Sequence, residues 1–197
     1  DVQEEPKRGK YHECDLVTPT VAEIEKIGSA GLFVQLDIAD ETAVAGLISA
    51  TVERFGGIDI LVNNAGIHIP GTTESMPSAD WDRVVGVNLR ALYLTSKYCI
   101  PHLKESSAGR IINIASIHAF GGGGGPAYAT AKAGVVNMTR NAAVELGGDG
   151  VTANAICPGY IETPIQDYLT LEQIEWCREK TPLPRLGLPR DIGRACV

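Results

Sequence analysis

The chain has 197 residues, 44% apolar and 21% charged, with a net charge of −7 at pH 7. This composition suits one globular domain and excludes a disordered chain, which would have fewer apolar residues and more net charge. The acidic balance, without a basic stretch, argues against nucleic acid as a partner. No apolar run approaches the roughly 20 residues that cross a bilayer, so we expect no membrane segment and a cytoplasmic protein.

Predicted helices and strands alternate along the chain after a polar N-terminal segment. Apolar residues at helical spacing predict helices over four segments: residues 20–31, 40–57, 77–104 (in one or two pieces) and 126–146. Short apolar runs predict strands over four others: residues 32–38, 58–66, 109–116 and 150–159. The remainder, residues 159–197, mixes helix with Pro and Gly turns.

Alternation of this kind predicts an α/β fold with a doubly wound, Rossmann-like parallel sheet and helices on both faces. Right-handed crossovers place the carboxyl ends of all strands at one edge, where such sheets bind ligands. Four groups of residues directly follow predicted strands: Asp37, residues 63–66 (NNAG), Ser116 and residues 158–159 (PG). We therefore expect the functional site at this edge.

Tyr128 and Lys132 lie four residues apart on the predicted helix 126–146, which places both on one face. An ammonium near a phenol lowers its pKa, and a phenol tuned in this way can exchange a proton with an alcohol. Ser116 ends the preceding strand and could bind the same substrate oxygen. A Tyr–Lys pair at this spacing is also common on solvated helix faces, and the five glycines at 121–125 could be a plain linker.

The cysteines and histidines suggest no metal site. The five cysteines are odd in number and never in CxxC spacing, which favours free thiols. The four histidines (His12, His68, His102 and His118) show neither metal-ligand spacing nor a cluster. His118 follows Ser116 closely, so it is either a substrate contact or a surface residue of the loop.

Five features in this order resemble the short-chain dehydrogenase/reductase family, over nearly the whole chain from about residue 20. They are NNAG at 63–66, Asn88, Ser116, YATAK at 128–132 and PGYIET at 158–163. The resemblance implies interconversion of a secondary alcohol and a ketone by hydride transfer with NAD or NADP. It implies substrates such as 3-oxoacyl thioesters, sugars or polyols, and steroids, and a homodimer or homotetramer built from the two long helices.

The resemblance also implies a role for each site residue. Tyr128 would be the general acid/base, assisted by Lys132, while Ser116 polarises the substrate oxygen and Asn88 holds a water that links Lys132 to solvent. Two further sets are implied. Cofactor contacts would come from Asp37, Ile38, Asn63, Ala65, Gly66, Pro158, Gly159, Ile161 and Thr163, with Tyr128 and Lys132. Substrate contacts would come from Ser116, Tyr128 and His118, and from a lid over residues 159–185.

The family's first βαβ unit, with a TGxxxGxG phosphate turn, is not found in these residues. The five glycines lie in the wrong crossover to replace it. We therefore expect residues 1–197 to be one Rossmann-like domain that is incomplete at both ends. Asp1 is a candidate for the acidic residue that binds the adenine ribose, which would favour NAD over NADP. The alternative is a catalytically inactive binding or scaffold protein.

Overall fold

The computed structural model describes residues 18–197, which form two compact units. One unit comprises residues 36–157 and is called the sheet unit below. The other comprises residues 18–35 and 158–197 and is called the small unit. The candidate site residues are distributed over both units, so each unit is described separately.

The sheet unit is built on three parallel strands, in the order β1 (Ile60–Asn63), β2 (Arg110–Ile114) and β3 (Thr152–Ile156). The register pairs Asn63 with Asn113 and Asn113 with Ala155. All three carboxyl ends therefore lie at the same edge. The predicted α/β fold with a parallel sheet is confirmed.

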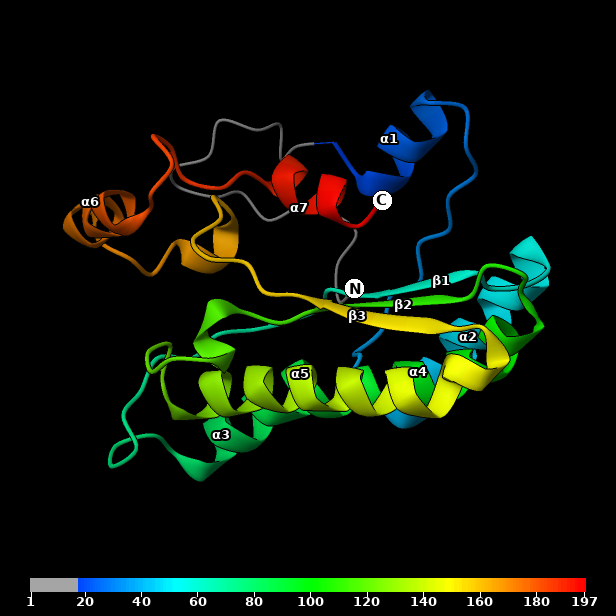
Figure 1. Ribbon diagram of the computed structural model, residues 1–197, viewed down its shortest axis with the longest axis horizontal. Helices are drawn as coiled ribbons and strands as arrows, with labels where there is room; N and C mark the ends of the chain where they lie inside the picture. Colours follow the sequence, from blue (N-terminus) through cyan, green and yellow to red (C-terminus); the bar gives the residue numbers. More distant parts are fainter. Residues whose placement is uncertain (1–17) are drawn as a thin grey trace. The chain divides into compact units, whose positions relative to one another are not determined.

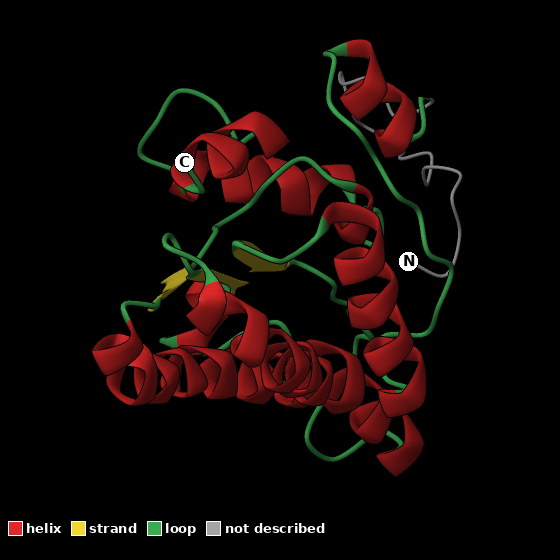
Figure 2. Cartoon of the chain, turned by 90° about the vertical axis from the view of Figure 1, so that its right-hand side faces the viewer, coloured by secondary structure: helices red, strands yellow, loops and turns green. Residues whose placement is uncertain are grey.

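Four helical segments complete the sheet unit. They are α2 (Glu41–Phe55), α3 (Ser78–Val85) with a π-helical turn (Gly86–Arg90), α4 (Ala91–Glu105) and α5 (Pro126–Leu146). Figure 1 shows α4 and α5 running along one face of the strands, and Figure 2 shows the same layer from the side. This layer encloses an apolar core around Leu103, Ile111 and Val151, all at most 1% exposed.

Local sequence signals explain where these helices begin. The Asp40 carboxylate accepts hydrogen bonds from the backbone amides of Thr42 and Ala43, at 2.8 and 3.2 Å, and so caps α2. Pro126 occupies the first position of α5, where its missing amide hydrogen costs nothing. Because Tyr128 is two residues further on, this start fixes the tyrosine in the first helical turn.

The prediction of a strand at residues 32–38 is wrong, because this segment has no regular structure apart from a turn at 38–39. A strand exists only through ladder hydrogen bonds to a neighbour, and within residues 18–197 no strand pairs with it. The chain also passes from the small unit to the sheet unit between Gln35 and Leu36. An apolar run alone therefore did not suffice to form a strand.

The small unit contains three short helices, α1 (Thr20–Lys26), α6 (Leu171–Lys180) and α7 (Pro189–Ala195). Thr170 and Gln173 form a capping box that starts α6. Arg185 binds both carboxylate oxygens of Asp191, at 2.6 and 3.0 Å, and hydrogen bonding from this guanidinium lowers the pKa of Asp191 to about 2. These contacts hold the Pro- and Gly-rich segment before α7 in place.

Candidate active site

The candidate active site lies at the carboxyl edge of the sheet unit. Ser116 follows β2 by two residues and is 6% exposed. Its Oγ accepts a hydrogen bond from the backbone amide of His118, at 3.2 Å. The hydroxyl proton is then available to a second partner, and the Ser116 side chain acts on Tyr128 in the direction that lowers the pKa of the phenol.

Tyr128 and Lys132 come from the first two turns of α5, as the spacing predicted. The Lys132 Nζ lies 5.6 Å from the centre of the Tyr128 ring. It donates a 2.7 Å hydrogen bond to the carbonyl oxygen of Ile114, the last residue of β2. Ser116, Tyr128 and Lys132 are therefore brought together, and the solvated-face alternative is wrong because Lys132 is buried.

Burial controls the proton affinities of this group. It lowers the pKa of Lys132 to about 8, and it raises the pKa of Tyr128, while the Ser116 side chain acts in the opposite direction on the tyrosine. We expected the ammonium to lower the pKa of Tyr128, and in this structure the net direction is upward. The reason is that desolvation of the phenol is the dominant influence, whereas the Lys132 Nζ is hydrogen-bonded to Ile114.

Asn88 lies within the π-helical turn between α3 and α4, a conformation that is frequent at functional sites. Its Nδ2 donates to the carbonyl oxygens of Ile67 and Val84, at 2.8 and 2.9 Å. Its Oδ1 is buried without a hydrogen-bond partner. A buried acceptor of this kind is costly, and the geometry suits a polar ligand or a bound water.

Gly66 leaves the space that Asn88 and Lys132 face. A Cβ atom at this position would lie 2.7 Å from Asn88 Oδ1 and 3.7 Å from Lys132 Nζ. A contact of 2.7 Å is too short for a carbon atom, so any larger residue would displace the amide. The glycine of NNAG is thus required here by close approach.

Asn63 connects the sheet to the helices by buried hydrogen bonds. Thr95 donates to Asn63 Oδ1 at 2.6 Å, and Asn63 Nδ2 donates to Asn113 Oδ1 at 2.8 Å. Asn113 Nδ2 in turn donates to Thr139 Oγ1 at 2.8 Å. This series, named the polar ladder below, runs from α4 through β1 and β2 to α5.

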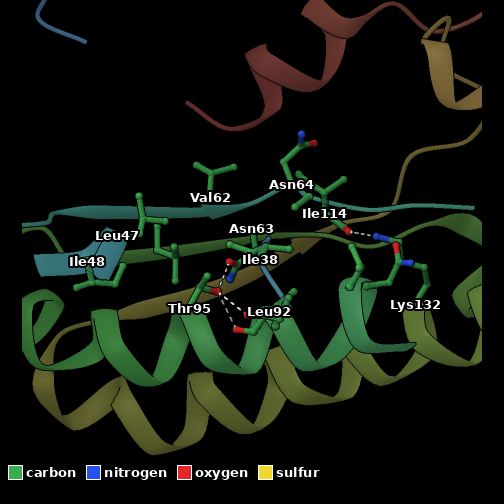
Figure 3. Close-up of a pocket in the computed structure, with 15 residues that line it drawn as sticks. Ile38, Leu47, Ile48, Val62, Asn63, Asn64, Leu92, Thr95, Ile114 and Lys132 are labelled. Atoms are coloured by element: carbon green, nitrogen blue, oxygen red, sulfur yellow. Dashed lines mark hydrogen bonds between the residues drawn. The ribbon is translucent and has the colours of Figure 1, made fainter. Parts of the chain in front are cut away.

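A hollow of about 150 Å³ lies beside these groups and is lined by Ile38, Ala65, Asn88, Lys132 and eleven other residues. Figure 3 shows Asn63 and Thr95 joined by a hydrogen bond on its helix side, with Lys132 reaching Ile114 at one end. Its volume suits a fragment such as one ring or a ribose rather than a whole drug-sized ligand, for which pockets are roughly 300–1,000 Å³.

The structure gathers two histidines that the sequence did not connect. The rings of His68 and His118 both meet the Tyr128 ring in T-shaped contacts, with centroid distances of 5.3 and 6.3 Å. The strand edge brings residues 68 and 118 to the same tyrosine, although within residues 18–197 neither belongs to a group of three metal-ligand side chains. The only available signal for His68 was its position two residues after NNAG.

The other residues predicted to contact the cofactor are not among those that line the hollow. Asp37 is exposed, and its carboxylate accepts a 2.9 Å hydrogen bond from the amide of Ala39. Four more belong to the small unit: Pro158, Gly159, Ile161 and Thr163. Asp1 lies outside the described residues.

Residues 18–197 show neither a membrane-spanning helix nor a cluster of metal ligands. None of the helices there is both long and apolar enough to span a membrane. No three His, Cys, Asp or Glu side chains in this part of the chain gather as metal ligands would. Cys99, Cys157, Cys177 and Cys196 are free thiols, as predicted.

Comparison with known proteins decides the family. The profile described as enoyl-(acyl carrier protein) reductase matches residues 11–197, and a crystal structure described as a short-chain dehydrogenase/reductase from Burkholderia xenovorans superposes with a TM-score of 0.81. The chain belongs to the short-chain dehydrogenase/reductase family. That structure is 32% identical, and the match covers 87% of this chain and 68% of the other.

Several characterised members of this oxidoreductase family are similar to the chain. The (2S)-[(R)-hydroxy(phenyl)methyl]succinyl-CoA dehydrogenase subunit BbsD of Thauera aromatica is 41% identical, with 94% of this chain and 75% of that protein covered. The 3-oxoacyl-[acyl-carrier-protein] reductase FabG of Thermotoga maritima is 34% identical, with 82% and 66% covered. The ligand-free aldohexose dehydrogenase of Thermoplasma acidophilum superposes with a TM-score of 0.77 at 30% identity, with 86% and 71% covered. The chain therefore spans about two thirds to three quarters of these relatives.

Proposed function

We propose that the protein interconverts a secondary alcohol and a ketone with NAD(P), using Tyr128 as the general acid/base. The observation that carries this proposal is the cluster of Ser116, Tyr128 and Lys132 at the carboxyl edge of the sheet unit. General acid/base catalysis needs such a group held within reach of the reacting oxygen. The matched relatives are named as dehydrogenases and reductases, which supports the same reaction class.

The residues of the sheet unit supply orientation and a proton. In the reductive direction the Tyr128 hydroxyl gives its proton to the carbonyl oxygen, and Ser116 hydrogen-bonds that oxygen as negative charge develops. Lys132 places a positive charge over the tyrosine ring, 5.6 Å from its centre. Asn88 Oδ1 is an open acceptor that can hold a water linking Lys132 to solvent.

The residues around the hollow fit part of a nicotinamide nucleotide. The buried, unpartnered Asn88 Oδ1 and the space that Gly66 leaves open both suit a polar group of a ligand. Ile38, Asn63, Ala65 and Lys132 would hold it there. When bound, NAD(P)H would supply the hydride for ketone reduction, and NAD(P)+ would accept it in alcohol oxidation. The preference for NAD over NADP stays a prediction, as do cofactor contacts from Asp37, Pro158, Gly159, Ile161 and Thr163.

We further propose that residues 159–185 form the substrate lid. Several large side chains of this segment are exposed, namely Ile165, Tyr168, Leu171 and Trp176. Apolar surface of this kind supports a substrate that is itself partly apolar. Relatives named for acyl thioesters and for an aldohexose keep 3-oxoacyl thioesters and sugars or polyols as candidate substrates, beside steroids. The free thiols agree with a cytoplasmic location.

The test is steady-state turnover of the full-length protein with NADH and NADPH against a panel of ketones from these classes. Tyr128→Phe keeps the ring but loses the transferable proton, and we expect kcat to fall about 10²–10⁴-fold. A Tyr128→Phe variant with the kcat of the parent protein would overturn the assignment. If the parent protein reduces no ketone and binds neither nucleotide in calorimetry, the binding or scaffold alternative is supported instead.

A further inference from the structure

His68 contacts the proposed catalytic tyrosine from a separate part of the chain. It lies in the loop after β1, and its ring meets the Tyr128 ring edge-on, at 5.3 Å and 82°. The same imidazole is 2.9 Å, through Nε2, from the carbonyl oxygen of Gly124. His68 therefore contacts both the tyrosine and the glycine loop that precedes its helix.

The proton on His68 can be assigned from this contact. A carbonyl oxygen only accepts hydrogen bonds, so Nε2 must carry the hydrogen. Burial lowers the pKa of His68, which favours the neutral ring with a single N–H. In the neutral ring, that single N–H is the one on Nε2, and it is directed at Gly124.

His68 holds the glycine run 121–125, whose backbone can adopt more conformations than that of other residues. Residues 121–125 are all glycine, and Gly124 has a φ of +73°, in the left-handed region. A Cβ on Gly124 would lie 3.0 Å from His118 and 3.1 Å from Tyr128, so the loop backbone packs directly on both rings. A glycine run loses much conformational entropy when it is ordered, and each contact that orders it matters.

His118 also contacts this loop. His118 Nδ1 lies 3.4 Å from the Gly122 carbonyl oxygen, which is long for a hydrogen bond. The contact between His68 and Gly124 is shorter, and it acts two residues before the first residue of α5. A loop that is fixed at this point fixes the direction in which the first turn of α5 presents Tyr128.

We propose that His68 is a positioning residue for Tyr128. His68 holds the glycine loop through its Nε2–H hydrogen bond to Gly124, and its ring packs against the tyrosine in a T-shaped contact. This inference rests on the proposed role of Tyr128 as general acid/base. His68 itself transfers no proton to substrate. The ionisable groups near it are Tyr128 on α5 and His118 on the turn Ile117–Ala119.

Two substitutions separate the ring from its hydrogen bond. His68→Phe keeps an aromatic ring against Tyr128 but donates nothing to Gly124, whereas His68→Gln keeps an N–H at similar reach. We expect kcat of His68→Phe to fall about tenfold, because the lost hydrogen bond to Gly124 no longer holds Tyr128 in the position that the transition state needs. The KM for the nucleotide should stay unchanged. His68→Gln should recover most of this loss. His102→Phe, at the end of α4, is the matched control and should keep the parent kcat.

The pH profile gives a readout that a purely structural role would not change. The Ser116 side chain acts to lower the pKa of Tyr128, so a displaced tyrosine should titrate at higher pH in kcat/KM. The inference fails if His68→Phe keeps both the kcat and the profile of the parent. If Tyr128→Phe is inactive at the same time, the proposed function stands and only the positioning role is lost.

A measurement on the parent protein covers the case in which His68→Phe does not fold. Histidine ¹⁵N NMR distinguishes the two neutral tautomers, and we expect His68 to carry its hydrogen on Nε2 at neutral pH. A hydrogen on Nδ1 would leave Nε2 without a proton to donate to Gly124 and would overturn the inference. This result does not depend on turnover, so it is independent of the role of Tyr128.

Discussion

At the scale of the residue, the burial of Lys132 changes the pH range in which its amine carries a charge. Its side chain is 4% exposed and donates to Ile114, yet it carries an ionisable amine. Burial disfavours the ammonium, which is why its pKa falls to about 8. A small rise in pH therefore removes a charge that an exposed lysine would keep.

The stability of the protein should report this shift. Between about pH 8 and pH 10.5 the unfolded chain binds a proton on Lys132 that the folded chain has lost, so stability rises with pH in this window. The slope is at most about 1.4 kcal/mol per pH unit. Lys132→Met has no titrating group, and we expect the free energy of unfolding of the parent, relative to that variant, to increase from pH 8 to pH 10. Urea unfolding at each pH measures this difference, and a difference that does not change with pH would contradict the buried ammonium.

At the scale of the element, the polar ladder joins two strands to the two long helices. Thr95, Asn63, Asn113 and Thr139 are linked in series across α4, β1, β2 and α5. Each amide uses both an acceptor and a donor in this series. A buried amide that loses one partner retains its desolvation cost, so the ladder also determines how the helices meet the sheet.

Thr139→Val should be destabilising, because it leaves the Nδ2 of Asn113 without its acceptor. We expect a loss of about 1–3 kcal/mol in the free energy of unfolding. Thr51→Val is a matched control, since Thr51 and Thr139 each donate to the carbonyl oxygen four residues earlier and only Thr139 also accepts from another side chain. The control should change stability by less than about 0.5 kcal/mol. Equal effects in chemical denaturation would show that the ladder adds nothing.

At the scale of the whole molecule, the two long helices are the expected oligomer surface. Tyr93 on α4 and Val144 on α5 are exposed apolar residues, and Val144 is 84% exposed. We propose a homodimer or homotetramer with these helices at the interface. Such an assembly would remove this apolar surface from water.

Sedimentation of the full-length protein tests the assembly. We expect a mass of two or four chains, and Val144→Glu should lower it because a carboxylate would be buried against apolar neighbours. Ile27→Glu, at a position that is 79% exposed in the small unit, is the control and should leave the mass unchanged. A parent protein that sediments only as a monomer would refute the proposal.

The sequence predicted those elements whose ends carry a local signal. Residues 126–146 form one helix as expected, because Pro126 favours the start and the glycine run from Gly147 disfavours continuation. The three paired strands were also predicted, since each lies within a short apolar run between two predicted helical or irregular segments. Residues 32–38 have the same composition and form no strand, because strand formation depends on a neighbour that composition does not show.

The sequence predicted those parts of the candidate site whose side chains are brought together by their spacing within one helix or strand. Tyr128 and Lys132 share a helix, and Ser116 follows the neighbouring strand β2 by two residues, so their proximity followed from the fold. His68 and His118 are 50 positions apart and meet only through the loops at the strand edge. The direction of the pKa of Tyr128 was missed for a similar reason, since burial depends on tertiary packing.

The π-helical turn at Gly86–Arg90 makes the site depend on the number of residues as well as on their identity. A π turn holds one residue more than an α turn, and each residue rotates a helix by about 100°. If one residue of this segment were deleted, the turn could close as ordinary α-helix. The preceding helix α3 would then rotate about the helix axis relative to α4. The apolar face of α4 would keep its contacts with the sheet, while the Asn88 carboxamide would leave Gly66. A deletion of one residue here should therefore impair catalysis by moving Asn88, even where the sheet unit still folds.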